Sequence, residues 1–156
     1  MSGDIDHSVN KKLESLLKKH PDTKLVIMKE VPGSMDDVAN LEAARLLRSK
    51  KIATHLPSDG VVASGGTDFF LAGVKRTLEK GAKIGVHSWA DGGFFSSKTA
   101  LDYPKDDEAH QLYLEYYKDM GIPTDFYWYT LQAAPAESIH WMTPTEITKY
   151  KILTDQ

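Results

Sequence analysis

Apolar residues along the chain follow two different spacings. A spacing of three to four residues, together with capping residues, predicts helices after Ser8 and at 36–50, 65–73, 74–80, 107–120 and 124–133, and from Pro144 onward. Short continuous apolar runs predict strands at 25–28, 52–56, 61–63 and 83–87. The first of these runs is flanked by polar residues, as in a strand buried on both faces. Strands alternate with helices, so the sequence predicts one α/β domain over residues 1–156.

Composition excludes several classes of function. The chain of 156 residues is 41% hydrophobic and 26% charged, with a net charge of −3, and its basic residues do not gather in one uninterrupted cluster. Nucleic-acid binding is therefore not expected. Because there is no cysteine, disulfides, thiolate nucleophiles and cysteine-ligated zinc are excluded. The six histidines lack the spacing of a zinc site, and we expect no metal and no cofactor.

Membrane and targeting signals are not visible in the sequence. No stretch approaches the roughly 18 apolar residues of a membrane span. The residues that open the sequence show no basic region followed by an apolar run, as a signal peptide would. We therefore expect a cytoplasmic protein by default. A periplasmic or secreted location stays open if a leader has been removed.

One serine stands where acyl-transfer chemistry would place a nucleophile. Residues 61–73 are expected to form an apolar strand, a sharp turn at Ser64 and a helix that closes at Gly73. Gly65 and Gly66 allow a tight turn and leave unpaired N–H groups at the helix start, where developing negative charge would be stabilised. The alternative is an ordinary turn in which Ser64 only caps the helix.

Two further segments are expected to meet this turn. Pro32-Gly33-Ser34 ends one predicted strand and opens a helix, and His87 ends another strand 23 residues after Ser64. In an open α/β arrangement, strand ends on one edge share a crevice in which ligands bind. A serine, a histidine and two amide-bearing turns on that edge would make an acyl-transfer site.

These motifs resemble the Clp-protease-like branch of the ClpP/crotonase superfamily. Pro32-Gly33-Ser34 is similar to the Pro-Gly-Gly oxyanion turn of Clp subunits, and Ser64 stands nine residues before Gly73, as their serine precedes a helix-ending Ala-Gly. Val86-His87 matches their histidine, and the segment 142–146, Met-Thr-Pro-Thr-Glu, matches their closing motif. The resemblance implies a repeated strand–strand–helix spiral with a projecting handle helix, here from about residue 107.

The resemblance also implies roles for individual residues. Ser64 would be the nucleophile and His87 its general base. The backbone N–H groups of Gly65 and of Gly33 or Ser34 would form the oxyanion hole. Clp subunits place an orienting aspartate about four residues before the Ser/Thr of the closing motif, where this chain has Ile139. The third member is therefore assigned to Glu137 or, as an alternative, Ser138, with the aspartates at 68, 91 and 102 less favoured.

Other polar and aromatic residues near these motifs have simpler interpretations. Asp68 is expected to cap its helix or to pair with Lys75 or Arg76, and His140 is interpreted as a packed histidine rather than a second base. The aromatic residues at 126–129 are expected to fill the core or an interface. Trp89 and Phe94 follow His87 and are the candidates for lining a substrate groove.

The sequence thus predicts a serine hydrolase that acts on peptides or carboxylic esters. The resemblance further implies a homo-oligomer. Two alternatives from other classes remain: a non-catalytic scaffold or binding module that keeps the fold, and a crotonase-type enzyme that acts on acyl-CoA thioesters. The uncertain third member favours the scaffold, whereas the serine and histidine motifs disfavour the crotonase.

Overall fold

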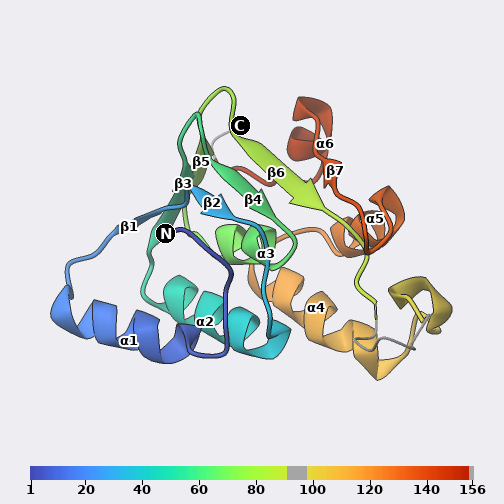
Figure 1. Cartoon of the computed structure of the whole chain (residues 1–156), viewed down its shortest axis with the longest axis horizontal. Coiled ribbons are helices and arrows are strands. Elements are labelled where there is room, and N and C mark those ends of the chain that lie inside the picture. The colour runs from blue at the N-terminus through green and yellow to red at the C-terminus, as the bar shows by residue number, and fades with distance from the viewer. Residues whose placement is uncertain (91–97, 155–156) are drawn as a thin grey trace.

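Two small sheets and the helices around them make up the structure, a computed structural model that describes residues 1–90 and 98–154 (Figure 1). The helices are α1 (Val9–Lys19), α2 (Asp37–Ser49), α3 (Gly65–Leu71), α4 (Glu108–Asp119), α5 (Asp125–Ala133) and α6 (Pro144–Lys149), with a short 3₁₀ helix, η1, at Ala100–Asp102. The strands are β1 (Leu25–Ile27), β2 (Glu30–Val31), β3 (Ala53–Leu56), β4 (Val61–Ala63), β5 (Arg76–Leu78), β6 (Lys83–Val86) and β7 (His140–Trp141).

The strands are arranged as a spiral. Each turn places one strand in a sheet of order β1-β3-β5 and the next in a sheet of order β2-β4-β6-β7, and α2 and α3 connect successive turns. All pairs are parallel except β6 with β7. This repeated strand–strand–helix path confirms the predicted α/β fold. It also brings the ends of β2, β4 and β6 to the same edge of one sheet, because these three strands are parallel neighbours.

Two details of the sequence prediction are wrong. Strand β1 is not buried on both faces, since Leu25 and Ile27 are 47% and 46% exposed at the edge of the first sheet. Residues 74–80 do not form a helix, because β5 occupies 76–78 and pairs with β3. Arg76 fixes this strand: its Nε donates to the Ile152 carbonyl (2.6 Å) and its Nη1 to the Gly73 carbonyl (3.2 Å). Tertiary contacts therefore override the local helical pattern.

Helices α2 and α3, which follow the turns at 32–34 and at Ser64, pack against each other in the core. Asp36 caps α2 by accepting the Ala39 N–H (3.0 Å), as its place before the apolar pattern predicts. The apolar face of α2 then packs on α3, and Leu41, Leu47, Phe69 and Phe70 are all 2% exposed or less. Every residue of α3 is buried, so the residues that follow the turn at Ser64 are fixed in the core.

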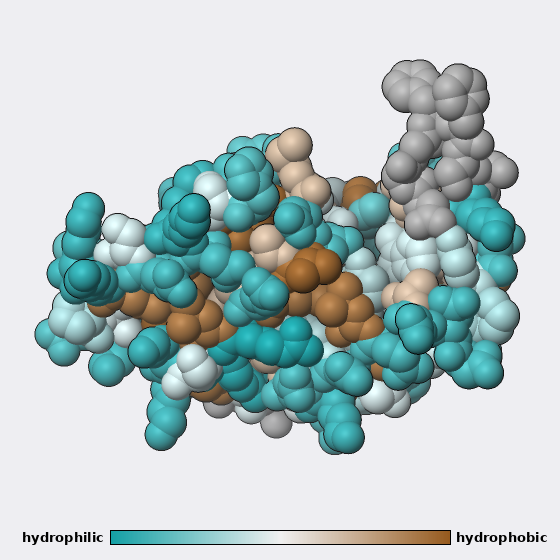
Figure 2. Space-filling model, turned by 90° about the horizontal axis from the view of Figure 1, so that it is seen from below, coloured by the Kyte–Doolittle hydropathy of each residue, from teal (hydrophilic) through white to brown (hydrophobic). Residues whose placement is uncertain are grey.

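Aromatic helices close the other side of α3. Tyr116 and Tyr117 of α4 and Phe126 and Tyr127 of α5 are at most 4% exposed, which confirms that part of the aromatic run at 126–129 packs in the core. On the face that carries α1 and α2, apolar surface forms a band between polar side chains (Figure 2). Among the helices of the described ranges, none combines the length and apolar character that a bilayer crossing requires.

Candidate active site

Ser64 occupies a strained turn between β4 and α3. Its φ is 53° and its ψ −130°, a region that non-glycine residues rarely adopt and that costs about 1–3 kcal/mol. Ser64 stands at the N-cap position of α3 and its carbonyl accepts the first helical N–H groups, but its side chain makes no capping hydrogen bond. Such a strained strand-to-helix turn displays the side chain of a nucleophile outward from the sheet.

Glycines let the two predicted turns touch. A Cβ on Gly66 would overlap the Val31 carbonyl at the end of β2, and a Cβ on Gly65 would overlap the Ser34 side chain. A Cβ on Gly33 would lie 3.7 Å from Ser64 Cβ, which is ordinary contact. The turn at 32–34 therefore lies directly against the Ser64 turn. The sequence predicted this meeting of strand ends.

Two backbone N–H groups on these turns make no hydrogen bond to a described residue. Within the described ranges, the N–H groups of Ser34 and Gly65 donate to no protein acceptor. The 32–34 turn is fixed by Ile5, whose N–H donates to Gly33 O (3.0 Å) and whose carbonyl accepts the Met35 N–H (2.8 Å). On the other side, Asn40 Nδ2 donates to Gly65 O (2.8 Å). Other groups therefore fix the two turns, and the N–H groups of Ser34 and Gly65 keep no protein acceptor within the described ranges.

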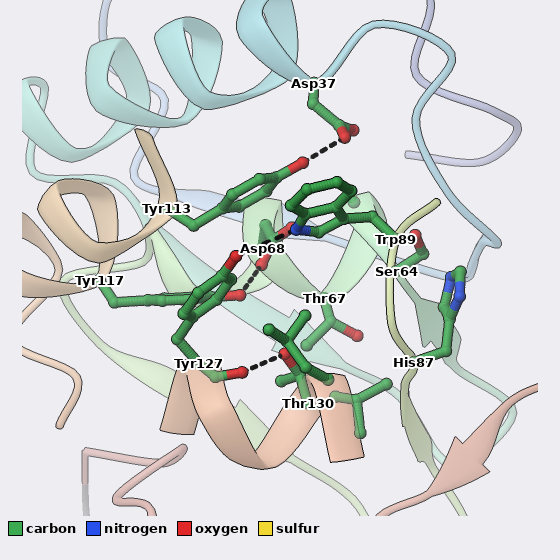
Figure 3. A pocket seen from close by; sticks show the side chains of 13 residues that line it. Asp37, Ser64, Thr67, Asp68, His87, Trp89, Tyr113, Tyr117, Tyr127 and Thr130 are labelled. Carbon is green, nitrogen blue, oxygen red and sulfur yellow. Dashed lines mark hydrogen bonds between the residues drawn. The ribbon is translucent and has the colours of Figure 1, made fainter. Parts of the chain in front are cut away.

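His87 follows β6 and lines the same cavity as Ser64 (Figure 3). Its Nδ1 is buried and has no hydrogen-bond partner. In the part of the chain that the structure describes, no hydrogen bond joins His87 to Ser64, to Glu137 or to Ser138, and the last two are exposed. The antiparallel pairing of Val86 with His140 places Ile139 opposite His87. An isoleucine therefore faces the catalytic candidate where an orienting carboxylate is expected.

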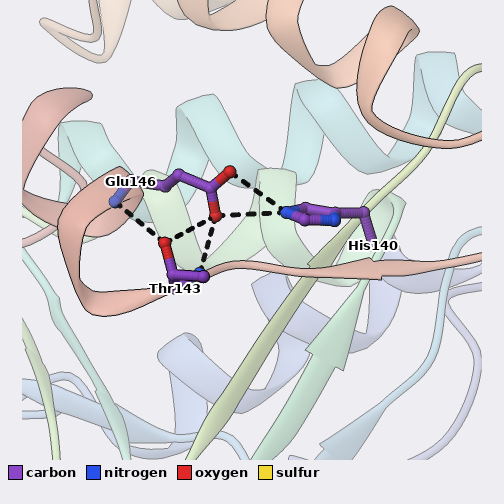
Figure 4. Close-up of polar contacts among 3 residues, drawn as sticks. All are labelled: His140, Thr143 and Glu146. Carbon is purple, nitrogen blue, oxygen red and sulfur yellow. Dashed lines mark hydrogen bonds and ion pairs between the residues drawn. The ribbon is translucent and has the colours of Figure 1, made fainter.

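His140 belongs to a separate polar cluster (Figure 4). Its Nε2 lies 3.1 Å from Glu146 Oε2, and the Thr143 N–H donates to the same oxygen (2.7 Å). The Thr143 and Glu146 side chains form the capping box of α6 that the sequence predicts. Burial raises the pKa of Glu146, but the hydrogen bonds from Thr143 and His140 outweigh it and bring that pKa down to about 2. His140 is packed in this cap and does not line the cavity beside Ser64.

The inner part of the cavity is acidic. Asp68, expected to pair with Lys75 or Arg76, instead accepts a hydrogen bond from Tyr117 Oη (2.6 Å). Asp37 accepts hydrogen bonds from Tyr113 Oη (2.5 Å) and from Ser34 Oγ. Burial raises the pKa of Asp68 to about 7, and the nearby Asp37 charge adds to this effect while the Tyr117 hydrogen bond opposes it.

The aromatic wall includes one predicted residue. Trp89 lines the cavity, and its Nε1 donates to Tyr127 Oη (3.0 Å), which in turn lies 2.7 Å from His110 Nδ1. Phe94 and Asp91 lie outside the described residues. Asp102 caps η1 through Thr99 and takes no part in the cavity.

Sequence reasoning missed several cavity residues, namely Asp37, Thr67, Tyr113, Tyr117, Tyr127 and Thr130. A signal was present in α4, where Tyr113 and Tyr117 are four residues apart and so share a face. On sequence grounds alone, that face is interpreted as the apolar stripe of the helix at 107–120. The hydroxyl ends of both side chains instead reach the two aspartates at 37 and 68.

Solved structures share this fold, although no family model and no curated protein matches the chain. The 1510-N membrane-bound stomatin-specific protease, with one serine replaced by alanine, superposes with a TM-score of 0.67 at 15% identity, over 98% of this chain and 74% of that one. A lysine-to-alanine variant in complex with a substrate peptide gives 0.63 at 16% identity, over 96% and 71%. The ClpP protease catalytic domain from Plasmodium falciparum gives 0.61 at 15% identity, over 98% and 80%. The predicted ClpP-like fold is confirmed.

Proposed function

We propose that the protein is a serine hydrolase that cleaves peptides or carboxylic esters with Ser64 as its nucleophile. The observation that carries this proposal is the strained Ser64 turn: its backbone holds a costly conformation, and its side chain makes no structural hydrogen bond in return. The shared fold adds support, since the solved neighbours are proteases by name.

The arrangement supports an acyl-transfer reaction in two steps. Ser64 Oγ attacks the substrate carbonyl while His87 takes its proton through a ring nitrogen. The N–H groups of Gly65 and of Ser34 or Gly33 stabilise the oxyanion of the tetrahedral intermediate. His87 then returns the proton to the leaving amine or alcohol, and water hydrolyses the resulting acyl ester of Ser64 by the reverse sequence of proton transfers.

Among the described residues, none is hydrogen-bonded to His87 as a third member of the centre. His87 Nδ1 has no partner in the described conformation, so the proton-transfer pair acts there without an orienting carboxylate. An imidazolium without such support is less stable, which predicts slow turnover. Glu137 or Ser138 would complete the centre only through a shift of the segment that precedes β7. A non-catalytic binding module is the competing function that this unpaired nitrogen favours.

Labelling with a fluorophosphonate separates the two functions. Intact mass should show stoichiometric modification of the wild type and none of Ser64→Ala, because only an activated serine reacts at a useful rate. His87→Ala should also lose labelling, whereas His140→Ala, a histidine of the α6 cap, should keep it. Folded wild-type protein that fails to react would favour the binding module.

The resemblance also leads us to propose a homo-oligomer. Sedimentation velocity should then show a species larger than one chain at micromolar concentration. A single species with the mass of one chain would contradict this part of the proposal.

A further inference from the structure

The cavity beside Ser64 contains two carboxyl groups and, among the described residues that line it, no lysine or arginine. We propose that this pocket receives a cationic, lysine-like side chain of the substrate, on the residue whose carbonyl Ser64 attacks. The inference rests on the proposed hydrolase function and defines its substrate class. Its binding component can be measured without any turnover.

Asp68 is the group that would meet the cation. It is 9% exposed, and its Oδ1 accepts the Tyr117 hydroxyl at 2.6 Å. No hydrogen bond from a described residue reaches its second carboxyl oxygen, which is not among the fully buried atoms and opens toward the cavity that Asp68 lines. An acceptor that opens into a cavity is available to a donor on a ligand. A ligand would supply this hydrogen-bond donor from the open side of the cavity, toward Ser64.

Asp37 adds negative charge to the same space. Both of its carboxyl oxygens already accept hydroxyl donors, one from Tyr113 and one from Ser34. These donors and the first turn of α2 hold Asp37 in place, and its charge acts on Asp68 closely enough to help raise the pKa of Asp68. Two neighbouring carboxyl groups favour a cation between them or a proton on one of them. A bound ammonium group would fulfil this role.

The walls of the cavity suit the stem of a lysine. Tyr113 stacks on Tyr127 with ring centroids 5.5 Å apart and planes 12° apart, and Trp89 stacks on Tyr113 at 6.4 Å and 15°. Aromatic faces pack well against methylene groups and attract a cation. The cavity volume is about 50 Å³, close to the space of one or two water molecules. Such a volume admits the ammonium end of an unbranched chain and is too small for a guanidinium group, while the methylene stem lies against the aromatic wall.

Binding to the Ser64→Ala variant tests the proposal apart from catalysis. The probes are two acetylated tripeptide amides that differ only in the last residue, lysine in one and the neutral isostere norleucine in the other, and calorimetry gives each dissociation constant at pH 8. The lysine peptide should bind at least about tenfold more tightly, because a hydrogen bond to a charged group is worth about that factor or more. In the double variant with Asp68→Asn this preference should fall to about twofold or less.

A matched control is Asp59→Asn, since Asp59 is an exposed aspartate whose carboxylate pairs with Lys29 at 3.5 Å and which does not line the cavity. That variant should keep the full lysine preference. Equal affinity for the two peptides, or a preference that survives Asp68→Asn, would overturn the proposal. Loss of fluorophosphonate labelling in the wild type with an intact lysine preference would reject the hydrolase and keep the pocket, so the two failures are distinguishable.

Discussion

Two carboxyl groups in this protein have opposite environments. Glu146, at the start of α6, accepts hydrogen bonds from the Thr143 N–H, the Thr143 hydroxyl and His140, and its pKa is about 2 (Figure 4). Asp68, at the bottom of the cavity beside Ser64, accepts one hydroxyl and faces a second carboxylate, and its pKa is about 7 (Figure 3). The fold uses both oxygens of Glu146, whereas Asp68 keeps one oxygen that no described residue reaches with a hydrogen bond.

The hydrogen bonds of Glu146 are those of a structural group, whereas the open oxygen of Asp68 is typical of a group that binds a ligand. Native proteins pair nearly all buried polar atoms, so an unpaired one calls for an explanation. One such atom, Nδ1 of His87, lies at the cavity, together with the open carboxyl oxygen of Asp68 and the strained backbone of Ser64. At the α6 cap, by contrast, Thr143 and His140 supply hydrogen bonds to both oxygens of Glu146. Changes at the cavity should therefore alter chemistry, and changes at the cap should alter stability.

The largest effect is expected at the oxyanion turn. Gly65→Ala places a methyl group against the Ser34 side chain and should push the two turns apart. The rate of fluorophosphonate labelling should fall by about 100-fold or more, as when one oxyanion donor is lost. Gly33→Ala, whose added methyl meets only ordinary contacts with Ser64, should stay within about fivefold of the wild type. Equal rates for the two variants would show that the contact of these turns is not needed.

Neutralising the two carboxylates should change stability in opposite directions. Asp68→Asn keeps an acceptor for Tyr117 and removes a buried charge, so at pH 8 it should raise the free energy of unfolding by about 2 kcal/mol. Glu146→Gln weakens charged hydrogen bonds and should lower it by about 1 kcal/mol. Urea denaturation of both variants measures the contrast. A loss of stability in Asp68→Asn would show that its charge is compensated.

The pH dependence of stability follows from the same two groups. Asp68 has a folded pKa of about 7, above its unfolded value of 3.8, so folding takes up a proton between these values and its contribution to stability falls as the pH rises through that window. Glu146 has a folded pKa of about 2, below its unfolded 4.5, so its contribution is present above pH 4.5 and is lost on acidification toward 2.

Melting temperatures of the variants relative to wild type test both statements. The advantage of Asp68→Asn should grow from pH 4 to pH 7 and then level off. The deficit of Glu146→Gln should be constant above pH 4.5 and should shrink below it. An Asp68→Asn advantage that is independent of pH would contradict the assignment of the effect to ionisation.

A smaller effect should report the strain at Ser64 directly. Ser64→Gly relieves the positive φ, whereas Ser64→Ala keeps it. The glycine variant should therefore be more stable than the alanine variant by about 1 kcal/mol, even though glycine usually destabilises a folded chain. Thermal melts of the two inactive variants provide the comparison. A less stable glycine variant would mean that the turn is not strained.

Local patterns were sufficient for much of this arrangement. The glycine-flanked Ser64, the turn at Gly33 and the capping box at Thr143 depend on residues close in sequence, and the structure has each of them where the sequence predicts. The β5 strand could not be predicted in this way, because Arg76 is held by carbonyl groups of the chain end, 75–76 residues away.

The acidic cavity depends on long-range contacts to an even greater extent. Tyr113 meets an aspartate 76 residues away, and Tyr117 meets one 49 residues away. The spacing of these tyrosines indicates only that they share a helix face. It does not indicate whether their hydroxyl groups lie in the apolar core or line a cavity. Burial of Asp68 likewise follows from α4 and α5 closing over α3, which no neighbouring residue in the sequence indicates.

The central claim is that the cavity beside Ser64 holds a largely buried carboxyl group with one oxygen available to a cationic ligand. A carboxyl-carbon NMR titration of selectively labelled Ser64→Ala protein tests this claim most directly. Asp68 should titrate with a midpoint near pH 7, and addition of the lysine peptide should move that midpoint downward, while Glu146 should stay ionised to about pH 2. An Asp68 midpoint near 4, unchanged by the lysine peptide, would contradict the account.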